Sequence, residues 1–273
     1  MKILNSQRAV VCCFVFVMAS GIPVFGPASS SPAPADFSPS LNGPVRDRPQ
    51  PTGWPPKGAT PQTPDGKPDL SGAWAPNAIR QNVDLRASLK EGGVAIPFQP
   101  WAEKLYLQRK ADFSKDDPES HCLPPGVPRM TTTPYPFRIM QTPKLIIIIY
   151  EGGAHIWRQI FMDGRPHPAD PNPNWLGDSI GHWEGDTLVV DTVGFNGLTW
   201  LDESGLPTTE SLHVIERFRR PDLGHLEIDN TVDDPKAYTK PWSFKTQPVM
   251  LKGELMEYIC QENNKDVQHL VGK

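Results

Sequence analysis

The stretch KLIIIIYEGGAHIWRQIFM, residues 144–162, decides the fold class. Its first part, 144–150, is a run of β-branched and apolar residues that is typical of a strand. The glycine pair within 151–154 supplies a turn, and 155–162 returns with side chains that alternate between two faces. The stretch therefore predicts a β-hairpin.

The same strand, turn and strand pattern recurs three times downstream. Residues 181–195, 211–234 and 242–262 each hold two strand-like runs around a turn that contains glycine. Alternating strand and helix units are absent, so a parallel sheet is not expected. The segment 98–111 has the apolar spacing of one amphipathic helix, and the proline-rich segment 116–137 predicts an ordered, packed loop. The expected architecture is a mainly β antiparallel meander that closes into a barrel or sandwich.

Composition excludes several classes of protein. The chain of 273 residues carries 27 Lys and Arg against 31 Asp and Glu, which gives a formal net charge of -4 and no basic stripe for nucleic acid. Its 32 prolines are spread along the whole chain and argue against a mainly helical fold. A chain of this length can bury a sufficient core unaided, so no cofactor is required. A metal site would use three or more of the histidines at 155, 167, 182 and 213 with a carboxylate, but no pair of them has the close spacing of a zinc site, so we expect no metal.

The N-terminal region predicts export. Residues 1–26 combine a basic start, an apolar run and small residues after it, which is the pattern of a signal peptide. A transmembrane anchor is the alternative, but the apolar run is interrupted short of a span. Residues 27–67 predict a flexible lead-in rich in Pro and Ser, and 68–273 a single domain. We expect a periplasmic or extracellular protein with no stable membrane anchor after cleavage; its oligomeric state is not predicted.

Cysteine usage fits an oxidising compartment. Cys12 and Cys13 fall within the predicted signal peptide, which leaves Cys122 and Cys260 in the mature chain. An even count in an exported protein predicts one disulfide, here between the front of the domain and its last strand. Two buried free thiols are the alternative.

The segment GDSIG, residues 177–181, matches the G-x-S-x-G pattern of a serine hydrolase. That pattern acts only where a strand precedes the serine and a helix follows it, because the sharp turn exposes the hydroxyl. Here a proline-rich loop precedes Ser179 and a hairpin follows it. Ser179 is therefore expected to be a hydrogen-bonding hydroxyl and not a nucleophile.

Polar residues of catalytic type are concentrated between residues 155 and 216, where loops meet strands. If the protein is an enzyme, a histidine beside a carboxylate would carry acid–base chemistry, because its pKa lies near neutrality. His167 or His213 would pair with Asp202 or Glu216. Aromatic side chains in this segment suit stacking on a ligand, or sealing of the core. The candidate ligand-binding residues are Arg158, Arg165, Ser179, His182, Trp183, Asn196 and Trp200.

Alternation along the strand-like run 211–220 places Glu216 among apolar residues. Val214, Glu216 and Phe218 share one face, whereas His213 lies on the other, so His213 and Glu216 do not face each other. An inward carboxylate is costly unless it is paired. Glu216 is therefore expected either to contact a ligand or to form an internal ion pair with an arginine such as Arg158.

Several motifs together resemble a broad family of secreted bacterial proteins that are mainly uncharacterised. The resemblance runs over 68–273 and supplies no function. The motifs are PDLSGAW (68–74), CLPPGVPR (122–129), DGRPHP (163–168), GDSIGHWEGDTLVVDTVGFN (177–196), SLHVIERFRR (211–220) and DDPKAYTKPW (233–242).

A second similarity concerns the first strand. Gly72-Ala73-Trp74 resembles the G-x-W signature of lipocalin-like barrels. It implies an antiparallel meander closing into a lipocalin-like barrel around a small-molecule cavity, with one short helix and long proline-rich loops here.

Two functions follow as hypotheses. The first is an exported β-barrel that binds a small organic ligand at a polar, aromatic-lined site between residues 155 and 216. The alternative is a periplasmic enzyme, a lyase, isomerase or hydrolase, that uses His, Asp and Glu on the same scaffold. Both predict that replacing Asp202 or His167 impairs function and leaves thermal stability nearly unchanged. An interaction module of the cell envelope is a third possibility and would need a large exposed apolar patch.

Overall fold

The computed structural model describes residues 52–77 and 79–262. The predicted signal peptide, with Cys12 and Cys13, lies outside the described residues, as does the lead-in up to residue 51. Residues 52–67 form no helix or strand, but hydrogen bonds hold them to the sheet region. The Trp54 indole donates to the Met250 carbonyl, and the Thr60 hydroxyl donates to the Arg220 carbonyl at 2.8 Å.

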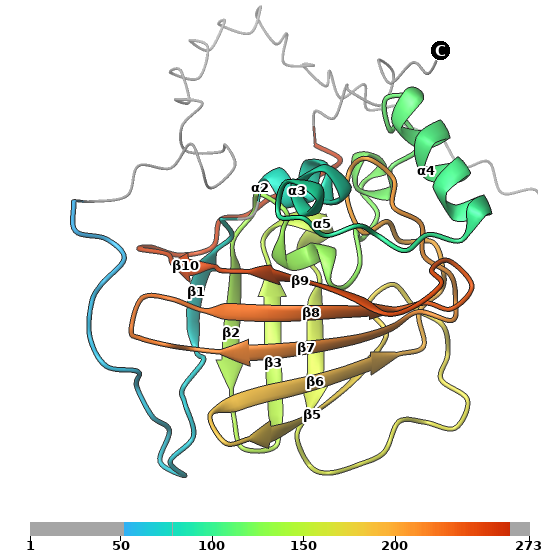
Figure 1. Cartoon of the computed structure of the whole chain (residues 1–273). Helices are drawn as coiled ribbons and strands as arrows, with labels where there is room; N and C mark the ends of the chain where they lie inside the picture. Colours follow the sequence, from blue (N-terminus) through green and yellow to red (C-terminus); the bar gives the residue numbers. More distant parts are fainter. Residues whose placement is uncertain (1–51, 78, 263–273) are drawn as a thin grey trace, which may run out of the picture. The chain divides into compact units, whose positions relative to one another are not determined.

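The fold is mainly β, as predicted. Ten strands form one sheet that curls into a half-barrel, in the order β10-β1-β2-β3-β4-β5-β6-β7-β8-β9. In Figure 1, β2–β4 cross behind β6–β9, so the two halves of the sheet face each other. The strands are β1 (Gly72–Ala75), β2 (Phe137–Gln141), β3 (Leu145–Tyr150), β4 (Trp157–Phe161), β5 (Asp178–Glu184), β6 (Thr187–Val193), β7 (His213–Arg219), β8 (Glu227–Asp233), β9 (Trp242–Thr246) and β10 (Val249–Met250).

The predicted hairpins β3–β4, β5–β6 and β7–β8 are confirmed. The last one differs from its prediction. The chain turns at Gln247 and Pro248 instead of after Met250, and β10 pairs with β1 and not with β9. No strand covers residues 254–262, because the chain leaves the sheet after β10.

One pair of neighbouring strands is parallel, contrary to the expectation of a purely antiparallel meander. β4 and β5 pair only at Ile160 with Ser179 and at Phe161 with Ile180. The proline-rich connection 162–177 carries the chain back along the sheet before β5 begins, which makes this pairing possible. The edge of β4 before Ile160 is therefore left without a strand partner from β5.

The predicted helix is present as α4 (Pro100–Ala111). Three further helices were not predicted: α2 (Ile79–Val83), α3 (Leu85–Glu91) and the single turn α5 (Gly152–His155), which occupies the expected hairpin turn. The helices gather at one end of the half-barrel in Figure 1. No helix among the described residues is long and apolar enough to cross a membrane.

The segment 116–137 is ordered and packed, as expected. It contains short 3₁₀ turns at Pro118–His121 and Arg129–Thr131, and residues 125–133 are buried throughout. Val127 and Met130 belong to two different hydrophobic clusters, so the segment fills space between them.

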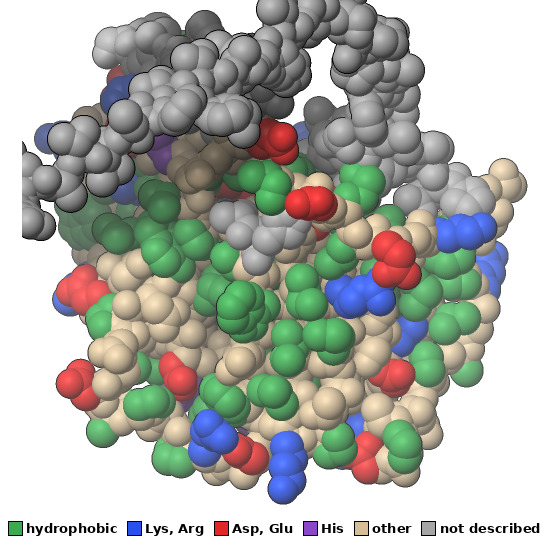
Figure 2. All heavy atoms as spheres, turned by 180° about the vertical axis from the view of Figure 1, so that it is seen from behind, with side chains coloured by type: hydrophobic (Ala, Val, Ile, Leu, Met, Phe, Trp, Pro, Cys, Tyr) green, Lys and Arg blue, Asp and Glu red, His purple; other side chains and the backbone are tan. Residues whose placement is uncertain are grey.

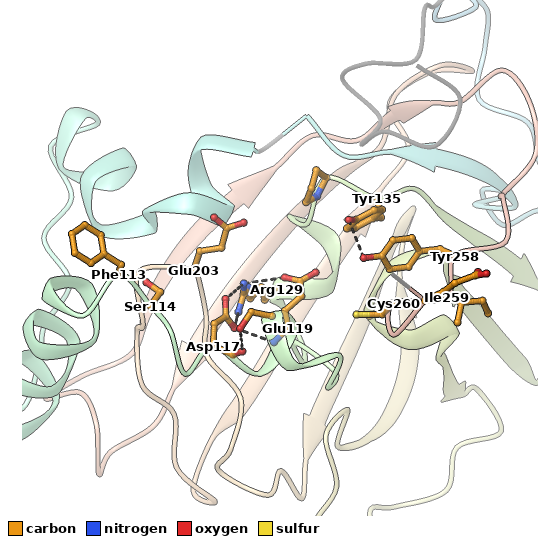
Figure 3. Close-up of a pocket in the computed structure, with 14 residues that line it drawn as sticks. Phe113, Ser114, Asp117, Glu119, Arg129, Tyr135, Glu203, Tyr258, Ile259 and Cys260 are labelled. Carbon is orange, nitrogen blue, oxygen red and sulfur yellow. Dashed lines mark hydrogen bonds and ion pairs between the residues drawn. The ribbon is translucent and has the colours of Figure 1, made fainter. Parts of the chain in front are cut away.

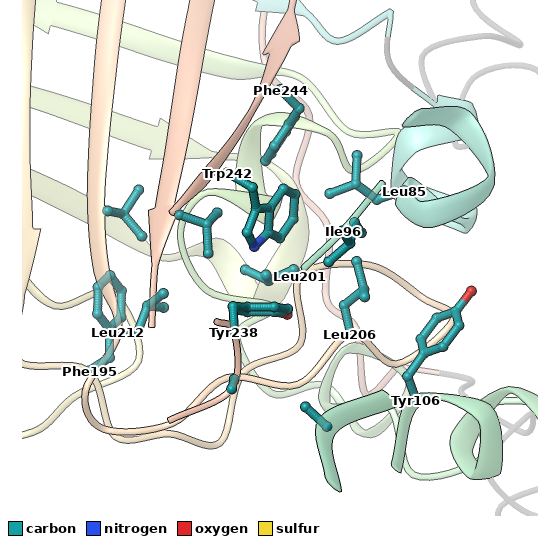
Figure 4. Close-up of a cluster of buried hydrophobic side chains, with 14 of the residues drawn as sticks. Leu85, Ile96, Tyr106, Phe195, Leu201, Leu206, Leu212, Tyr238, Trp242 and Phe244 are labelled. Carbon is teal, nitrogen blue, oxygen red and sulfur yellow. The ribbon is translucent and has the colours of Figure 1, made fainter. Parts of the chain in front are cut away.

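Two hydrophobic clusters make up most of the core. One lies inside the curled sheet and includes Trp74, Ile148 and Phe218. The other lies between α3, α4 and the ends of β7–β9, where Figure 4 shows Leu85 beside Trp242 and Tyr106 farther out on α4. Some inward residues of β7 and β8 belong to one cluster and some to the other. Where the two clusters meet, β7 carries the buried Glu216 and β8 carries the buried Asn230.

The back of the molecule is partly apolar. Figure 2 shows hydrophobic side chains across the middle of this face, with charged ones mostly toward its margins. Outward positions of β2–β4 contribute, because Met140 and Trp157 are 40% and 62% exposed.

Candidate functional site

A cavity of about 460 Å³ opens where β4 loses its pairing with β5. The loop before β5 forms the opposite wall, and inward and outward side chains of β4 both reach the cavity. We call it the β4 cavity. Its defining residues are Trp157, Arg158, Phe161, Trp175, Asp178 and Ser179.

Arg158 forms the floor of the β4 cavity. Alternation along β4 turns its side chain inward, where it is 2% exposed. Its Nε donates to Ser179 Oγ at 2.9 Å, and its Nη2 donates to Thr192 Oγ1 at 2.7 Å. Nη2 also lies 2.6 Å from Glu216 Oε2. Of the two alternatives expected for Glu216, a ligand contact or an internal ion pair, the structure shows the ion pair with Arg158.

The hydrogen bonding of this floor is incomplete. Among the described residues, the buried atoms without a regular hydrogen bond include Arg158 Nη1 and two acceptors that interact with Arg158, the Tyr150 hydroxyl and Glu216 Oε1. Buried polar atoms in folded proteins are nearly always paired with protein, water or ligand. Burial by itself would lower the pKa of Arg158. The negative charge of Glu216 more than offsets this effect, so the net shift of the Arg158 pKa is upward. The guanidinium therefore remains a charged donor.

Ser179 does not have the setting of a nucleophile. The Ser179 side chain is buried. Its hydroxyl oxygen accepts a hydrogen bond from Arg158 Nε and lies 3.1 Å from Thr192 Oγ1. It stands at the start of β5, with no helix after it. This agrees with the expectation that Ser179 acts as a hydrogen-bonding hydroxyl.

Aromatic side chains form the walls of the β4 cavity. Trp157 is 62% exposed, and Trp175 and Phe161 line the cavity with it. The Arg165 guanidinium lies 4.0 Å from the centre of the Phe161 ring and pairs with Asp163. Of the predicted ligand-binding residues, Arg158 and Ser179 line the cavity, and Arg165 stands behind its wall.

A histidine–aspartate cluster adjoins the same cavity on the outer face of the sheet. His167 Nδ1 lies 2.7 Å from Asp178 Oδ1, and His167 Nε2 lies 3.2 Å from Asp191 Oδ1. His213 Nε2 lies 2.8 Å from the same Asp191 oxygen. The expected pairing of these histidines with Asp202 or Glu216 is therefore wrong, because Glu216 points inward. Within the described residues, no group of three or more His, Cys, Asp or Glu is arranged to hold a metal ion.

Asp202 holds the backbone of the fold together. It is fully buried and accepts hydrogen bonds from the amides of Leu85, Gly205 and Leu206. Burial raises its pKa to about 7, and the amides of Leu206 and Leu85 oppose that shift. It does not line the β4 cavity. These contacts tie α3 to the 202–206 turn and favour a structural role.

The remaining predicted ligand-binding residues also lie away from the β4 cavity. His182 is exposed beside Glu184, at 3.2 Å, and Trp183 lies on the same strand near Lys67. Asn196 accepts a hydrogen bond from the Leu198 amide within its own loop. Trp200 is buried beneath Arg109, whose guanidinium is 4.2 Å from the ring centre.

A second cavity, of about 510 Å³, was not predicted from the sequence. Figure 3 shows Arg129 beside Asp117 and Glu119, and Tyr135 next to Tyr258, whose hydroxyl lies 3.3 Å from that of Tyr135. Arg129 donates to both oxygens of Asp117 at 2.7 Å and to Glu119 at 2.9 Å. Burial raises the pKa of Glu119 to about 7 despite the Arg129 charge. One signal in the sequence could have indicated this cavity: the proline-rich segment 116–137 carries several charged residues although it was expected to pack.

The predicted disulfide between Cys122 and Cys260 is present. It joins residues 138 apart in sequence, and Cys260 contributes to the wall of the second cavity. Cys260 lies beyond the sheet and not in a last strand, as the prediction had placed it.

Comparison with known proteins gave no relative. No protein-family model matches the chain, and searches of curated proteins and of solved structures found no match either. The resemblances noted from the motifs therefore remain predictions, and the function has to be argued from the site itself.

Proposed function

We propose that the protein binds a small organic ligand in the β4 cavity. The observation that carries this proposal is the lining of the cavity, in which Trp157, Phe161 and Trp175 stand with the polar residues Asp178 and Ser179. A binding site needs a few fixed polar groups in a largely apolar hollow, and the aromatic walls supply the rest. Its volume, about 460 Å³, falls within the usual range for small-molecule sites.

The neighbouring contacts support a site that is formed in advance. Ser179, Thr192 and Glu216 fix the Arg158 side chain at three points, so this part of the cavity lining is rigid before a ligand arrives. A site whose side chains are already held in place loses little entropy on binding. Trp157 is exposed enough to fold over a ligand without breaking a core contact.

A neutral fluorescent naphthyl ketone, 6-propionyl-2-dimethylaminonaphthalene, tests this proposal. We expect saturable binding with a blue-shifted emission, and a Trp157→Ala variant that binds about fivefold more weakly, since an aromatic contact is worth about 1 kcal/mol. Trp101→Ala is the matched control, because Trp101 is also exposed, at 45%, but lies on α4 and does not line the cavity. Absence of saturable binding, or equal affinity in the two variants, would contradict the proposal.

We also propose that the protein is exported. A disulfide is typical of proteins that fold in oxidising compartments. The basic start and apolar run of residues 1–26 have the pattern of a signal peptide. Expression of the full chain with N-terminal sequencing of the secreted product tests both points, and recovery of the uncleaved chain in the cytoplasm would contradict them.

A second candidate function, acid–base catalysis, has one specific observation in its favour. Asp178 lines the β4 cavity and lies 2.7 Å from His167 Nδ1. A carboxylate beside an imidazole can take a proton from water as the water attacks an ester carbonyl. Saturable hydrolysis of 2-naphthyl acetate that is lost in Asp178→Asn and kept in His182→Gln would support an enzyme. Equal rates in both variants and in buffer would exclude this reaction.

A further inference from the structure

One main-chain edge of β4 faces the β4 cavity. The Tyr150 amide donates to the Ile156 carbonyl at 3.0 Å, so the even-numbered residues along β4 turn their main-chain groups toward β3. Main-chain groups alternate in direction along an antiparallel strand, so those of Trp157 and Gln159 point the other way, toward β5. The pairing of β4 with β5 starts only at Ile160.

The main-chain groups of Trp157 are left without a partner in the described part of the chain. The chain just before β5 turns away from β4, because the Asn174 amide donates to the Gly194 carbonyl and the Asn196 amide donates to the Asn174 carbonyl, both at 3.0 Å. Neither the amide nor the carbonyl of Trp157 has a hydrogen bond to another described residue. The place beside Trp157 that a longer β5 would occupy is therefore the β4 cavity.

A ligand can reach this edge, and it meets no unmatched charge there. Trp157 is 62% exposed, so this part of β4 is open to solvent. Of the charged side chains in the lining, Arg158 pairs with Glu216, and Asp178 lies 2.7 Å from His167. The β4 cavity therefore offers a ligand main-chain hydrogen bonds and apolar contacts.

From this geometry we propose that the β4 cavity takes a short, uncharged peptide in an extended conformation, which adds a strand to the edge of β4. One residue of the peptide lies opposite Trp157 and exchanges both main-chain hydrogen bonds with it, as in an antiparallel pair. The side chain of that residue lies on the same face as the Trp157 indole, where an aromatic ring is favoured. This inference rests on the proposed function, because it names the chemical class of the same ligand.

A free peptide suits this edge better than a strand from a second copy of the chain. The loop that carries Trp175 and Leu176 forms the opposite wall of the cavity, so the edge of β4 is not open to a neighbouring sheet. A strand of a folded copy would have to enter between this loop and β4, whereas a peptide enters by its end. The cavity volume, about 460 Å³, limits the occupant to a few residues.

The tripeptide acetyl-Val-Phe-Val-amide and two N-methylated forms of it test the proposal. In the paired strand the main-chain groups of the peptide's Phe face β4, and those of both Val face away. We expect saturable binding to the full mature protein by calorimetry. A methyl group on the Phe nitrogen should weaken binding about fivefold, since one hydrogen bond is lost. A methyl group on the nitrogen of the second Val should change the affinity little.

Amide hydrogen exchange followed by NMR shows where the peptide binds. With saturating peptide, we expect exchange of the Trp157 amide to slow by about tenfold or more, because this amide gains a hydrogen bond. The Arg158 amide is the internal control, since it already faces β3 and should exchange at the same rate with and without peptide.

The outcomes separate this inference from the proposed function. Equal affinity of the three peptides, or binding that leaves the Trp157 amide unprotected, would overturn the inferred ligand class. Protection of Trp157 that grows with protein concentration in the absence of peptide would assign the edge to a second copy and overturn it too. If the naphthyl ketone binds and the peptide does not, the peptide inference fails while the binding function stands. Failure of both to bind would overturn the binding function itself.

Discussion

Arg158 on β4 and Glu216 on β7 form an ion pair of 2.6 Å across the interior of the half-barrel, and both side chains are withdrawn from solvent. The pair lies between the two hydrophobic clusters: on β7, Val214 belongs to one cluster and Phe218 to the other. A buried pair of this kind fixes how the facing halves of the sheet meet.

Breaking this pair from one side should be severe. In Glu216→Gln the Arg158 charge stays buried without a counter-ion, and we expect a loss of about 3–5 kcal/mol in the free energy of unfolding. The double variant Arg158→Met, Glu216→Leu should recover much of that loss, because no charge remains. Urea denaturation measures both. Glu184→Gln is the control: its pair with Arg217 is exposed at 2.7 Å, and its loss should leave the stability nearly unchanged.

The disulfide should contribute substantially to stability. Because Cys122 and Cys260 are 138 residues apart, the bond restricts a long loop in the unfolded chain. We expect Cys122→Ser with Cys260→Ser to lower the unfolding free energy by about 2–5 kcal/mol. Reducing agent should destabilise the wild-type protein by a similar amount and leave the double variant unaffected. An effect of the reductant on the double variant would show that another thiol is responsible.

Local patterns in the sequence predicted much of the sheet. Alternation along residues 211–220 predicted that Glu216 points inward, because the period of a strand assigns each side chain to one face. It also offered the pairing with Arg158 as one of two alternatives, and the structure shows that pairing. Strand β2 was missed, since it follows a segment full of proline, and α2 and α3 were missed because they are short and depend on contacts with distant residues. One such contact is the amide of Leu85 on Asp202.

The candidate site was harder to predict than the strands. The β4 cavity depends on where β5 stops pairing with β4, which follows from the path of the 162–177 loop and not from any local period. The same loop brings His167 to Asp178 and not to Glu216. The second cavity joins residue 119 to residues 129 and 260, which no spacing in the sequence relates.

Glu119 should make stability depend on pH. Its pKa in the folded protein is raised to about 7 from 4.5, so the native state retains a proton that the unfolded chain loses above 4.5. The stabilisation is fully present below pH 4.5 and is lost as the pH rises to 7. Between these values, wild-type unfolding free energy should fall relative to Glu119→Gln by up to about 1.4 kcal/mol per pH unit. Parallel pH profiles for the two proteins would refute the assignment.

Gly177 should be the most sensitive glycine near the β4 cavity. It has a φ of +71°, and a Cβ there would lie 2.6 Å from Thr192 Cγ2 and 2.7 Å from the Val193 carbonyl oxygen. Gly164 has a similar φ of +78°, with no atom within 4 Å of an added Cβ, so Gly164→Ala reports on backbone strain alone, about 1–2 kcal/mol. We expect Gly177→Ala to cost about 1–3 kcal/mol more than this control, because it also overpacks the site.

The same substitution should weaken ligand binding, since Thr192 holds Arg158 Nη2 at 2.7 Å and would be displaced. Urea denaturation gives the difference in stability between the two alanine variants, and titration with the naphthyl ketone gives the difference in affinity. If Gly177→Ala lost no more stability than Gly164→Ala, then the loop before β5 yields easily and the cavity floor is not fixed by Thr192. In Gly177→Ala the displaced Thr192 should move the Arg158 guanidinium with it. If stability fell but the affinity for the ketone did not, then ligand binding does not depend on the position of Arg158.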